Sequence, residues 1–207
     1  MHPDRDVTPA VAAARRATLA TRRIIAATVN GSAPAPDLEA AADSLERLAD
    51  TLEPHARTSR YDGTPGVQLG GDNTAILESH PMIGPSNPLA PPMALSRDRD
   101  GACATAIYGH QYEGPPGRVH GGFIAAAFDQ VVGAAAALSG KAFFTGTLTV
   151  RYFAPTPLHV PVQFEGTLDG IEDRRIHASA RLLVDGKVTA EAEGVMVTVP
   201  DATFHGI

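Results

Sequence analysis

The 207-residue chain has no tryptophan and a single cysteine, Cys103, and aromatic residues make up only 5% of it. One cysteine cannot build a disulfide framework or a CxxC metal site. So few aromatic side chains offer little surface for stacking against single-stranded nucleic acid. The chain also lacks a basic excess, because its net charge is −6. This acidic balance disfavours a general nucleic-acid binder.

Long apolar runs are also missing. No stretch of 18 or more apolar residues occurs, so no membrane-spanning helix is expected. The first six residues are polar and charged and no apolar segment follows them, which predicts no secretory signal and a cytoplasmic location. The histidines show no HxH or HExxH spacing, so no metal site is expected either. Apolar residues still make up 43% of the chain, which is enough for a packed core.

Residues 1–60 are predicted to form a helical extension of two helices. The first runs from Thr8-Pro9, a favourable start, to Asn30-Gly31, a stop signal. The second begins near Pro36-Asp37, with its leucines on one face and its acidic residues on the other. The charged residues of the first helix are all arginines, namely Arg15, Arg16, Arg22 and Arg23. A basic helix next to an acidic one predicts mutual packing, and a surface for an anionic partner is the alternative.

Residues 61–92 are rich in proline and are expected to form a connecting loop. Residues 93–200 alternate like a β-domain, and tight turns such as Asp185-Gly186 predict antiparallel pairing. Strands are expected over 102–108, 142–153, around 162–168, 176–184 and 188–199. In the second of these strands, one face is expected to carry Phe144, Leu148, Val150 and Tyr152.

The segment Gly121–Leu138 is apolar nearly all the way round, and Asp129 is its only charge. A helix apolar on every face is buried on every side, which predicts an α+β fold with an antiparallel sheet around a central helix. An ionised carboxylate is costly there unless it is hydrogen-bonded or its pKa is raised. Such carboxylates concentrate at active sites. Asp129 is therefore a candidate base or nucleophile, with a structural cap as the alternative.

The helix opens with His120-Gly121-Gly122. Free N–H groups at a helix start, helped by the helix dipole, can stabilise an oxyanion. A plain turn into a helix is the alternative for the two glycines. His120 could equally be a core histidine that is hydrogen-bonded to a backbone carbonyl.

The run Tyr112–Gly122, followed by Asp129 nine residues after His120, resembles the hotdog-fold acyl-CoA thioesterases of the phenylacetyl-CoA and human HGG-Asp types. Gly84–Leu89 resembles the GPxNP loop that many of them carry before their first strand. The resemblance covers about residues 83–199. It implies two strands, a buried central helix and four further strands, with the helical extension outside it.

The resemblance implies hydrolysis of acyl-CoA to the free acid and coenzyme A, with no cofactor other than the coenzyme A of the substrate. Asp129 would activate water or attack the thioester, and the Gly121 amide would polarise the carbonyl. The other implied roles are positioning by His120, orientation of water or the carboxylate by Thr145, substrate contacts by Gly122 and Asn87, and coenzyme A phosphate contacts by Arg174 and Arg175.

Two positions depart from the family pattern. Many relatives have Asp-Glu where this chain has Asp129-Gln130, so any role of the second acid is lost. A cysteine common before the GPxNP loop is replaced by Ile83. A non-catalytic acyl-CoA- or lipid-binding hotdog protein is the alternative function. A hydratase is disfavoured because no suitable Asp–His pair is seen, and a DNA-binding regulator is disfavoured by the acidic total.

The spacing of Gly121 and Asp129 predicts an oligomer. Eight residues along a helix amount to about 12 Å of axial rise. Both groups must come within about 3 Å of one thioester carbonyl, and a single helix cannot place them there. We therefore expect a homodimer or a dimer of dimers, in which Asp129 of one chain faces Gly121 of another.

Overall fold

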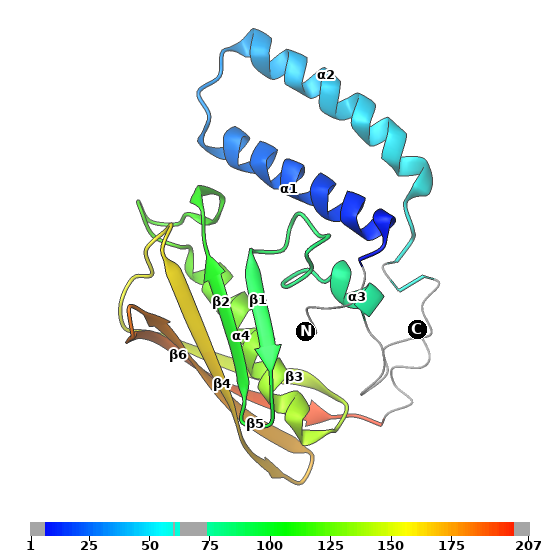
Figure 1. Cartoon of the computed structure of the whole chain (residues 1–207). Coiled ribbons are helices and arrows are strands. Elements are labelled where there is room, and N and C mark those ends of the chain that lie inside the picture. The colour runs from blue at the N-terminus through cyan, green and yellow to red at the C-terminus, as the bar shows by residue number, and fades with distance from the viewer. Residues whose placement is uncertain (1–6, 60, 63–73, 201–207) are drawn as a thin grey trace.

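The computed structural model describes residues 7–59, 61–62 and 74–200 (Figure 1). Its main part is a six-stranded antiparallel sheet in the order β1-β2-β4-β5-β6-β3. The strands are β1 (Met93–Arg97), β2 (Ala102–Ile107), β3 (Phe143–Tyr152), β4 (Pro161–Glu172), β5 (Arg175–Val184) and β6 (Lys187–Thr198). The helix α4 (Gly121–Ala136) and its 3-10 extension η3 (Ala137–Ser139) pack against one face of this sheet. The expected sheet wrapped around a central helix is confirmed.

Period-two alternation builds the sheet. In β2 buried residues alternate with exposed ones, and in β5 they alternate with exposed or half-buried ones, as expected for strands with one face on the core. Asp185 and Gly186 have φ values of 49° and 74° between β5 and β6. Two positive φ values in a two-residue loop match the type I′ hairpin that this dipeptide favours, so the predicted turn is confirmed.

Helix α4 lies close to the sheet because two strand positions are glycine. A Cβ on Gly166 would meet Val131 Cγ1 at 2.8 Å, and a Cβ on Gly194 would meet Val132 Cγ1 at 2.4 Å. On the same face the Phe128 ring packs edge-on against Phe164, with ring centroids 5.3 Å apart. The small strand residues therefore set how deeply the helix seats in the core.

The expectation that α4 is buried on every side is wrong for the single chain. Gly122 and Asp129 are exposed, and several other residues of the helix are half-buried. Its buried residues are Ile124, Ala127, Phe128, Val131, Val132, Ala135 and Ala136. By length and hydropathy Gly121–Ser139 could cross a membrane. In the structure this segment is instead the core helix, packed against strands of the sheet.

Strand β3 carries a β-bulge that changes which side chains share a face. Thr145 pairs with Met196 and Thr147 pairs with Val195, so Gly146 is the extra residue. Thr145 therefore shares the helix-facing side with residues from Leu148 onward, whereas Phe144 turns outward and is 52% exposed. The prediction that Phe144 lies on the same face as Leu148 is wrong for this reason.

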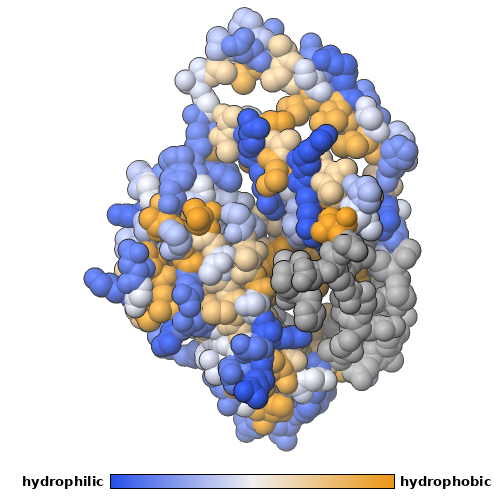
Figure 2. All heavy atoms as spheres, in the orientation of Figure 1, coloured by the Kyte–Doolittle hydropathy of each residue, from blue (hydrophilic) through white to orange (hydrophobic). Residues whose placement is uncertain are grey.

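The helical extension consists of α1 (Pro9–Asn30), α2 (Ala35–Leu52) and the 3-10 turn η1 (Glu53–His55). The side chain of Thr8 accepts a hydrogen bond from Val11 N and caps α1 as expected. The predicted close packing of the two helices is wrong, because no residue of α2 is buried. Leu45 and Leu48 on its apolar face are 39% and 49% exposed. Figure 2 shows apolar side chains of the extension open to the surface.

The connecting segment falls partly outside the described residues. The part that the structure describes contains a short helix, α3 (Thr74–Glu78), within the range expected to be loop. The turns that follow α3 lead to β1 and run beneath α1, to which they are hydrogen-bonded. This segment therefore joins the extension to the sheet domain.

Candidate active site

His120 directly precedes α4 and is its N-cap residue. Its backbone is extended, with φ −62° and ψ 130°, and its Nδ1 atom accepts a hydrogen bond of 3.0 Å from Gly122 N. Because Nδ1 is an acceptor, the neutral ring carries its proton on Nε2. The side chain of His120 is exposed, so the alternative of a core histidine is wrong.

The amide of Gly121 is the available donor at this helix end. An α-helix cannot satisfy its own first N–H groups. The Gly122 amide donates to His120 Nδ1, whereas no acceptor for Gly121 N is found among the described residues. The structure therefore leaves Gly121 N as the candidate oxyanion donor. The amide of Gly122 serves the cap.

Tyr152 is a residue of this site that sequence reasoning did not assign. Its Oη atom donates a hydrogen bond of 2.8 Å to the carbonyl of Gly121. Partial burial raises the pKa of the Tyr152 phenol, which keeps it in the donor form. The alternation of residues along β3 places Tyr152 on the same face as Leu148 and Val150. This pattern cannot show which backbone group the Tyr152 hydroxyl reaches.

Asp129 and Thr145 are brought together as the resemblance implied. Thr145 Oγ1 donates a hydrogen bond of 3.0 Å to Asp129 Oδ1, from β3 to the middle of α4. The bulge at Gly146 lets Thr145 face the helix while the next part of β3 still packs on the core. Both side chains are exposed, so the expectation of a buried Asp129 is wrong for the single chain.

The remaining predicted residues lie elsewhere. Asn87 Nδ2 donates to Ser79 O at 3.0 Å and its Oδ1 atom accepts from Leu89 N at 2.9 Å, so its amide holds the loop together. Arg174 and Arg175 are exposed at the turn between β4 and β5. Arg174 Nη2 also donates to the carbonyl of Thr198 at 3.1 Å.

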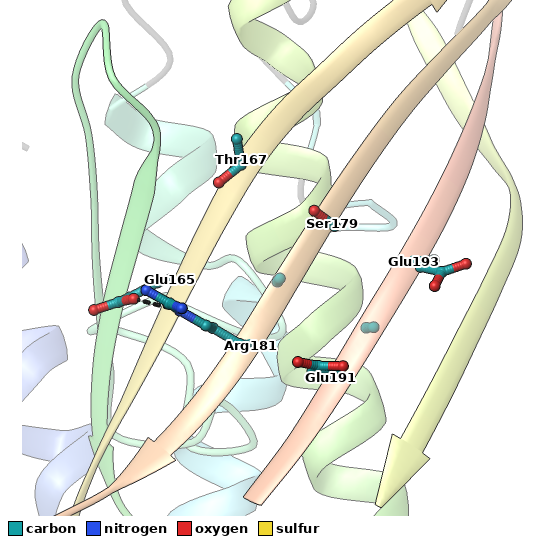
Figure 3. Close-up of a pocket in the computed structure, with 8 residues that line it drawn as sticks. Glu165, Thr167, Ser179, Arg181, Glu191 and Glu193 are labelled. Carbon is teal, nitrogen blue, oxygen red and sulfur yellow. Dashed lines mark hydrogen bonds and ion pairs between the residues drawn. The ribbon is translucent and has the colours of Figure 1, made fainter. Parts of the chain in front are cut away.

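The outer face of the sheet has a shallow depression that contains none of the predicted site residues (Figure 3). Glu165, Glu191, Glu193 and Arg181 line it, and Arg181 Nε donates to Glu165 Oε2 at 2.8 Å. In Figure 3 these side chains lie on strands whose other side faces α4. The depression carries more negative than positive side chains, so it would repel the phosphates of coenzyme A.

The described residues contain no group of three or more histidine, cysteine, aspartate or glutamate side chains arranged to hold a metal ion. What the arrangement offers chemically is a carboxylate held by a hydroxyl, an amide donor at a helix start, and a phenol that fixes the donor's own carbonyl. Such a set can activate an oxygen nucleophile and stabilise an oxyanion.

Comparison with known proteins gives a consistent result. The family model for the thioesterase superfamily matches residues 116–191. A crystal structure of the thioesterase superfamily protein RHA08564 is 34% identical and superposes with a TM-score of 0.78, over 89% of this chain and 94% of that one. The chain belongs to the thioesterase superfamily. Its sheet and central helix have the hotdog fold of that superfamily.

Two named relatives match a shorter stretch. Human (Homo sapiens) acyl-coenzyme A thioesterase THEM5 is 38% identical over 71 residues, which is 34% of this chain and 29% of that protein. Acyl-coenzyme A thioesterase THEM4 from Xenopus laevis is 38% identical over 74 residues, which is 36% of this chain and 33% of that protein. This chain therefore matches about a third of each relative's length.

Proposed function

We propose that this protein hydrolyses acyl-CoA thioesters to the free acid and coenzyme A. The observation that carries the proposal is that Asp129, which accepts a hydrogen bond from Thr145, lies on the same helix as Gly121. The amide of Gly121 has no acceptor among the described residues. Asp129 takes a proton from water, or attacks the carbonyl carbon itself, while Gly121 N stabilises the oxyanion. In the first route the resulting hydroxide adds to the carbonyl carbon, the C–S bond breaks, and the thiolate of coenzyme A takes the proton that Asp129 removed from water. In the second route the C–S bond breaks to leave an acyl–Asp129 anhydride, and water cleaves this anhydride to the free acid and supplies the proton of the coenzyme A thiol.

The active unit in this proposal is a homodimer or a dimer of dimers. Gly121 and Asp129 are about 12 Å apart along α4, so one chain cannot bring both groups to one carbonyl. Strand β3 is an edge of the sheet, ten residues long, and most of its residues are exposed. A long open edge is a template for pairing with another strand. Pairing there would bring a second copy of α4 towards the Asp129–Thr145 pair.

The proposal also assigns roles to the other candidate residues. His120 caps α4 and holds the turn, and Gly122 and Asn87 shape their loops, because their polar groups are already hydrogen-bonded within the chain. Arg174 and Arg175 supply positive charge for the phosphates of coenzyme A. The reaction needs no cofactor, and the cytoplasmic location stays a prediction.

Complementation between two inactive variants tests the proposal. Asp129→Asn removes the base, and Gly121→Pro removes the donor at the first helical position, where proline suits a helix. Each variant alone should lose at least about a hundredfold in the rate of acyl-CoA hydrolysis. Random mixing of the two should restore about a quarter of wild-type activity, since half the dimers are heterodimers with one working site each.

The outcomes separate the alternatives. Heterodimers verified by mass spectrometry that stay inactive would contradict the shared site, as would a fully active wild-type monomer. Wild-type protein that binds acyl-CoA esters from a panel of chain lengths but hydrolyses none of them would be a non-catalytic acyl-CoA-binding protein instead.

A further inference from the structure

Helix α1 packs against the rest of the chain through one face. Residues on that face are buried or half-buried and recur at helical spacing, whereas Arg16 and Arg23 on the other side are exposed. The residues of the packed face are Val11, Arg15, Thr18, Thr21, Arg22, Ile25 and Ala26. Two of the four arginines of α1 therefore point at the protein rather than at solvent or an anionic partner.

Arg15 fastens α1 to the end of α3. Its guanidinium forms two hydrogen bonds with the carboxylate of Glu78, one from Nε to Oε2 at 3.2 Å and one from Nη2 to Oε1. Ser86 Oγ also donates to Glu78 Oε2, at 2.7 Å. The ion pair thus connects α1 to the end of α3 and, through Ser86, to the turns that precede β1.

Arg22 holds the next part of the same turn. Its Nη2 atom donates to the carbonyl of Asn87 at 2.8 Å and lies 3.4 Å from the carbonyl of Gly84. Its Nε atom is buried without a hydrogen-bond partner among the described residues. A buried donor without an acceptor costs stability.

The turn and α1 both lead to the start of α4 through Tyr112, which lies in the 3-10 turn η2 (His110–Tyr112) that α1 contacts. Tyr112 Oη donates to the carbonyl of Ala90 at 3.5 Å, and its ring packs edge-on against Phe123 with centroids 4.9 Å apart. Its own carbonyl accepts a hydrogen bond of 2.8 Å from His120 N. Burial raises the pKa of Tyr112, and the nearby charge of Arg22 opposes that rise.

We propose that α1 is part of the catalytic scaffold and that Arg22 is a positioning residue for the Gly121 oxyanion donor. Arg22 holds the turn at Gly84 and Asn87 and lies beside Tyr112, and Tyr112 in turn fixes His120 and Phe123 on either side of the two glycines. This inference rests on the proposed function, because it assigns a role in presenting the donor of that reaction.

The test compares Arg22→Met with Arg23→Met, the neighbouring arginine that is exposed on α1. Displacement of the donor should lower kcat of Arg22→Met about ten- to a hundredfold, with KM within about threefold of wild type. Arg23→Met should behave like wild type. Arg22→Lys should recover most of the lost kcat, because an ammonium group can still donate to the Asn87 carbonyl.

A second readout does not depend on activity. Hydrogen exchange of the amides of His120, Gly122 and Phe123, all hydrogen-bonded in this turn, should speed up about tenfold in Arg22→Met and stay unchanged in Arg23→Met. If the methionine variant does not fold, Arg22→Gln takes its place in both measurements. The inference is overturned if the Arg22 variant has the same kcat and the same amide exchange rates as wild type and Arg23→Met. Wild-type protein without thioesterase activity would overturn the proposed function instead. The exchange rates alone would then show whether Arg22 holds the turn at the start of α4.

Discussion

Thr145 Oγ1 donates a 3.0 Å hydrogen bond to Asp129 Oδ1, although both side chains are exposed in the single chain. Water competes for an exposed hydrogen bond, so its net contribution to stability is small. In the proposed mechanism its consequence is larger, because this hydrogen bond fixes the direction in which the Asp129 carboxylate presents its second oxygen. Stability and activity should therefore respond differently to changes at these two residues.

Thr145→Val should lower kcat by about tenfold, the effect of losing one hydrogen bond to a charged group worth about 1.5 kcal/mol. Thr145→Ser keeps the hydroxyl and should stay near wild type. The matched control is Thr147→Val, beyond the bulge and on the opposite face of β3. Steady-state kinetics on one acyl-CoA ester measure the effect. Equal losses in the two valine variants would remove Thr145 from the mechanism.

Asp129→Asn should change the free energy of unfolding by no more than about 0.5 kcal/mol, because Asp129 is exposed. The same change at Asp169 is its control. Ser179 Oγ donates to Asp169 Oδ1 at 2.9 Å on the outer face of the sheet, so the same kind of hydrogen bond is altered there. Urea denaturation should find both variants near wild type, and only Asp129→Asn should lose turnover. Strong destabilisation by Asp129→Asn alone would indicate a structural carboxylate.

Replacing Arg174 and Arg175 with alanine should raise KM for coenzyme A esters several-fold and leave short thioesters without the nucleotide unaffected. Contacts to a remote phosphate supply binding energy rather than carbonyl chemistry. Arg181→Ala, on the outer face where it pairs with Glu165, removes one positive charge and is the control for each of the two single variants. The phosphate role is wrong if both substrate types respond equally to the double variant.

The ion pair between Glu78 and Arg15 should make the attachment of α1 to the rest of the chain depend on pH. The hydrogen bonds from Arg15 lower the pKa of the Glu78 carboxyl below its ordinary value of 4.5. A carboxyl whose pKa is lowered on folding stabilises the native state above the unfolded pKa, and this stability is lost as pH falls through the folded pKa. The difference in Tm between wild type and Glu78→Gln should therefore be full at pH 7 and shrink below about pH 4.5. A difference that is constant with pH would contradict this assignment.

Removing residues 1 to about 60 should leave a folded sheet domain. The buried core cluster begins at Met93, and α2 buries no residue. The truncated protein should keep the β-rich circular dichroism spectrum and a cooperative melt, at a lower Tm because the contacts of Arg15 and Arg22 are lost. A truncated protein without a cooperative transition would show that α1 completes the core.

The parts of the fold predicted correctly rest on local signals. Thr8-Pro9 and Asp185-Gly186 carry their backbone preferences with them, so the cap of α1 and the hairpin could be placed from sequence. The position of Asp129 on the central helix follows from spacing alone. The exposure of Asp129 could not be predicted in this way, because the apolar composition of a helix does not show which of its faces the same chain covers.

The errors have physical causes as well. Arg15 and Arg22 were grouped with the exposed arginines of α1, because hydropathy counts a charge without knowing its partner, which here lies more than 60 residues away in the chain. The packing of α2 on α1 was inferred from opposite charges, which are screened at the surface and do not fix a contact. Tyr152 was placed on the correct face, but its bond to Gly121 depends on the whole sheet.

The bulge at Gly146 also determines how the chain tolerates insertions and deletions. Thr145 and Leu148 are three residues apart and still face the same way, because one residue between them does not advance the pleat. Deleting Gly146 would remove the bulge and leave Thr145 and Leu148 two positions apart on one face of a regular strand, so the site would keep its orientation. Inserting one further residue between them would instead turn one end of β3 over. The orientation of the hydroxyl towards Asp129 is thus encoded in the length of the strand, where substitution scanning cannot detect it.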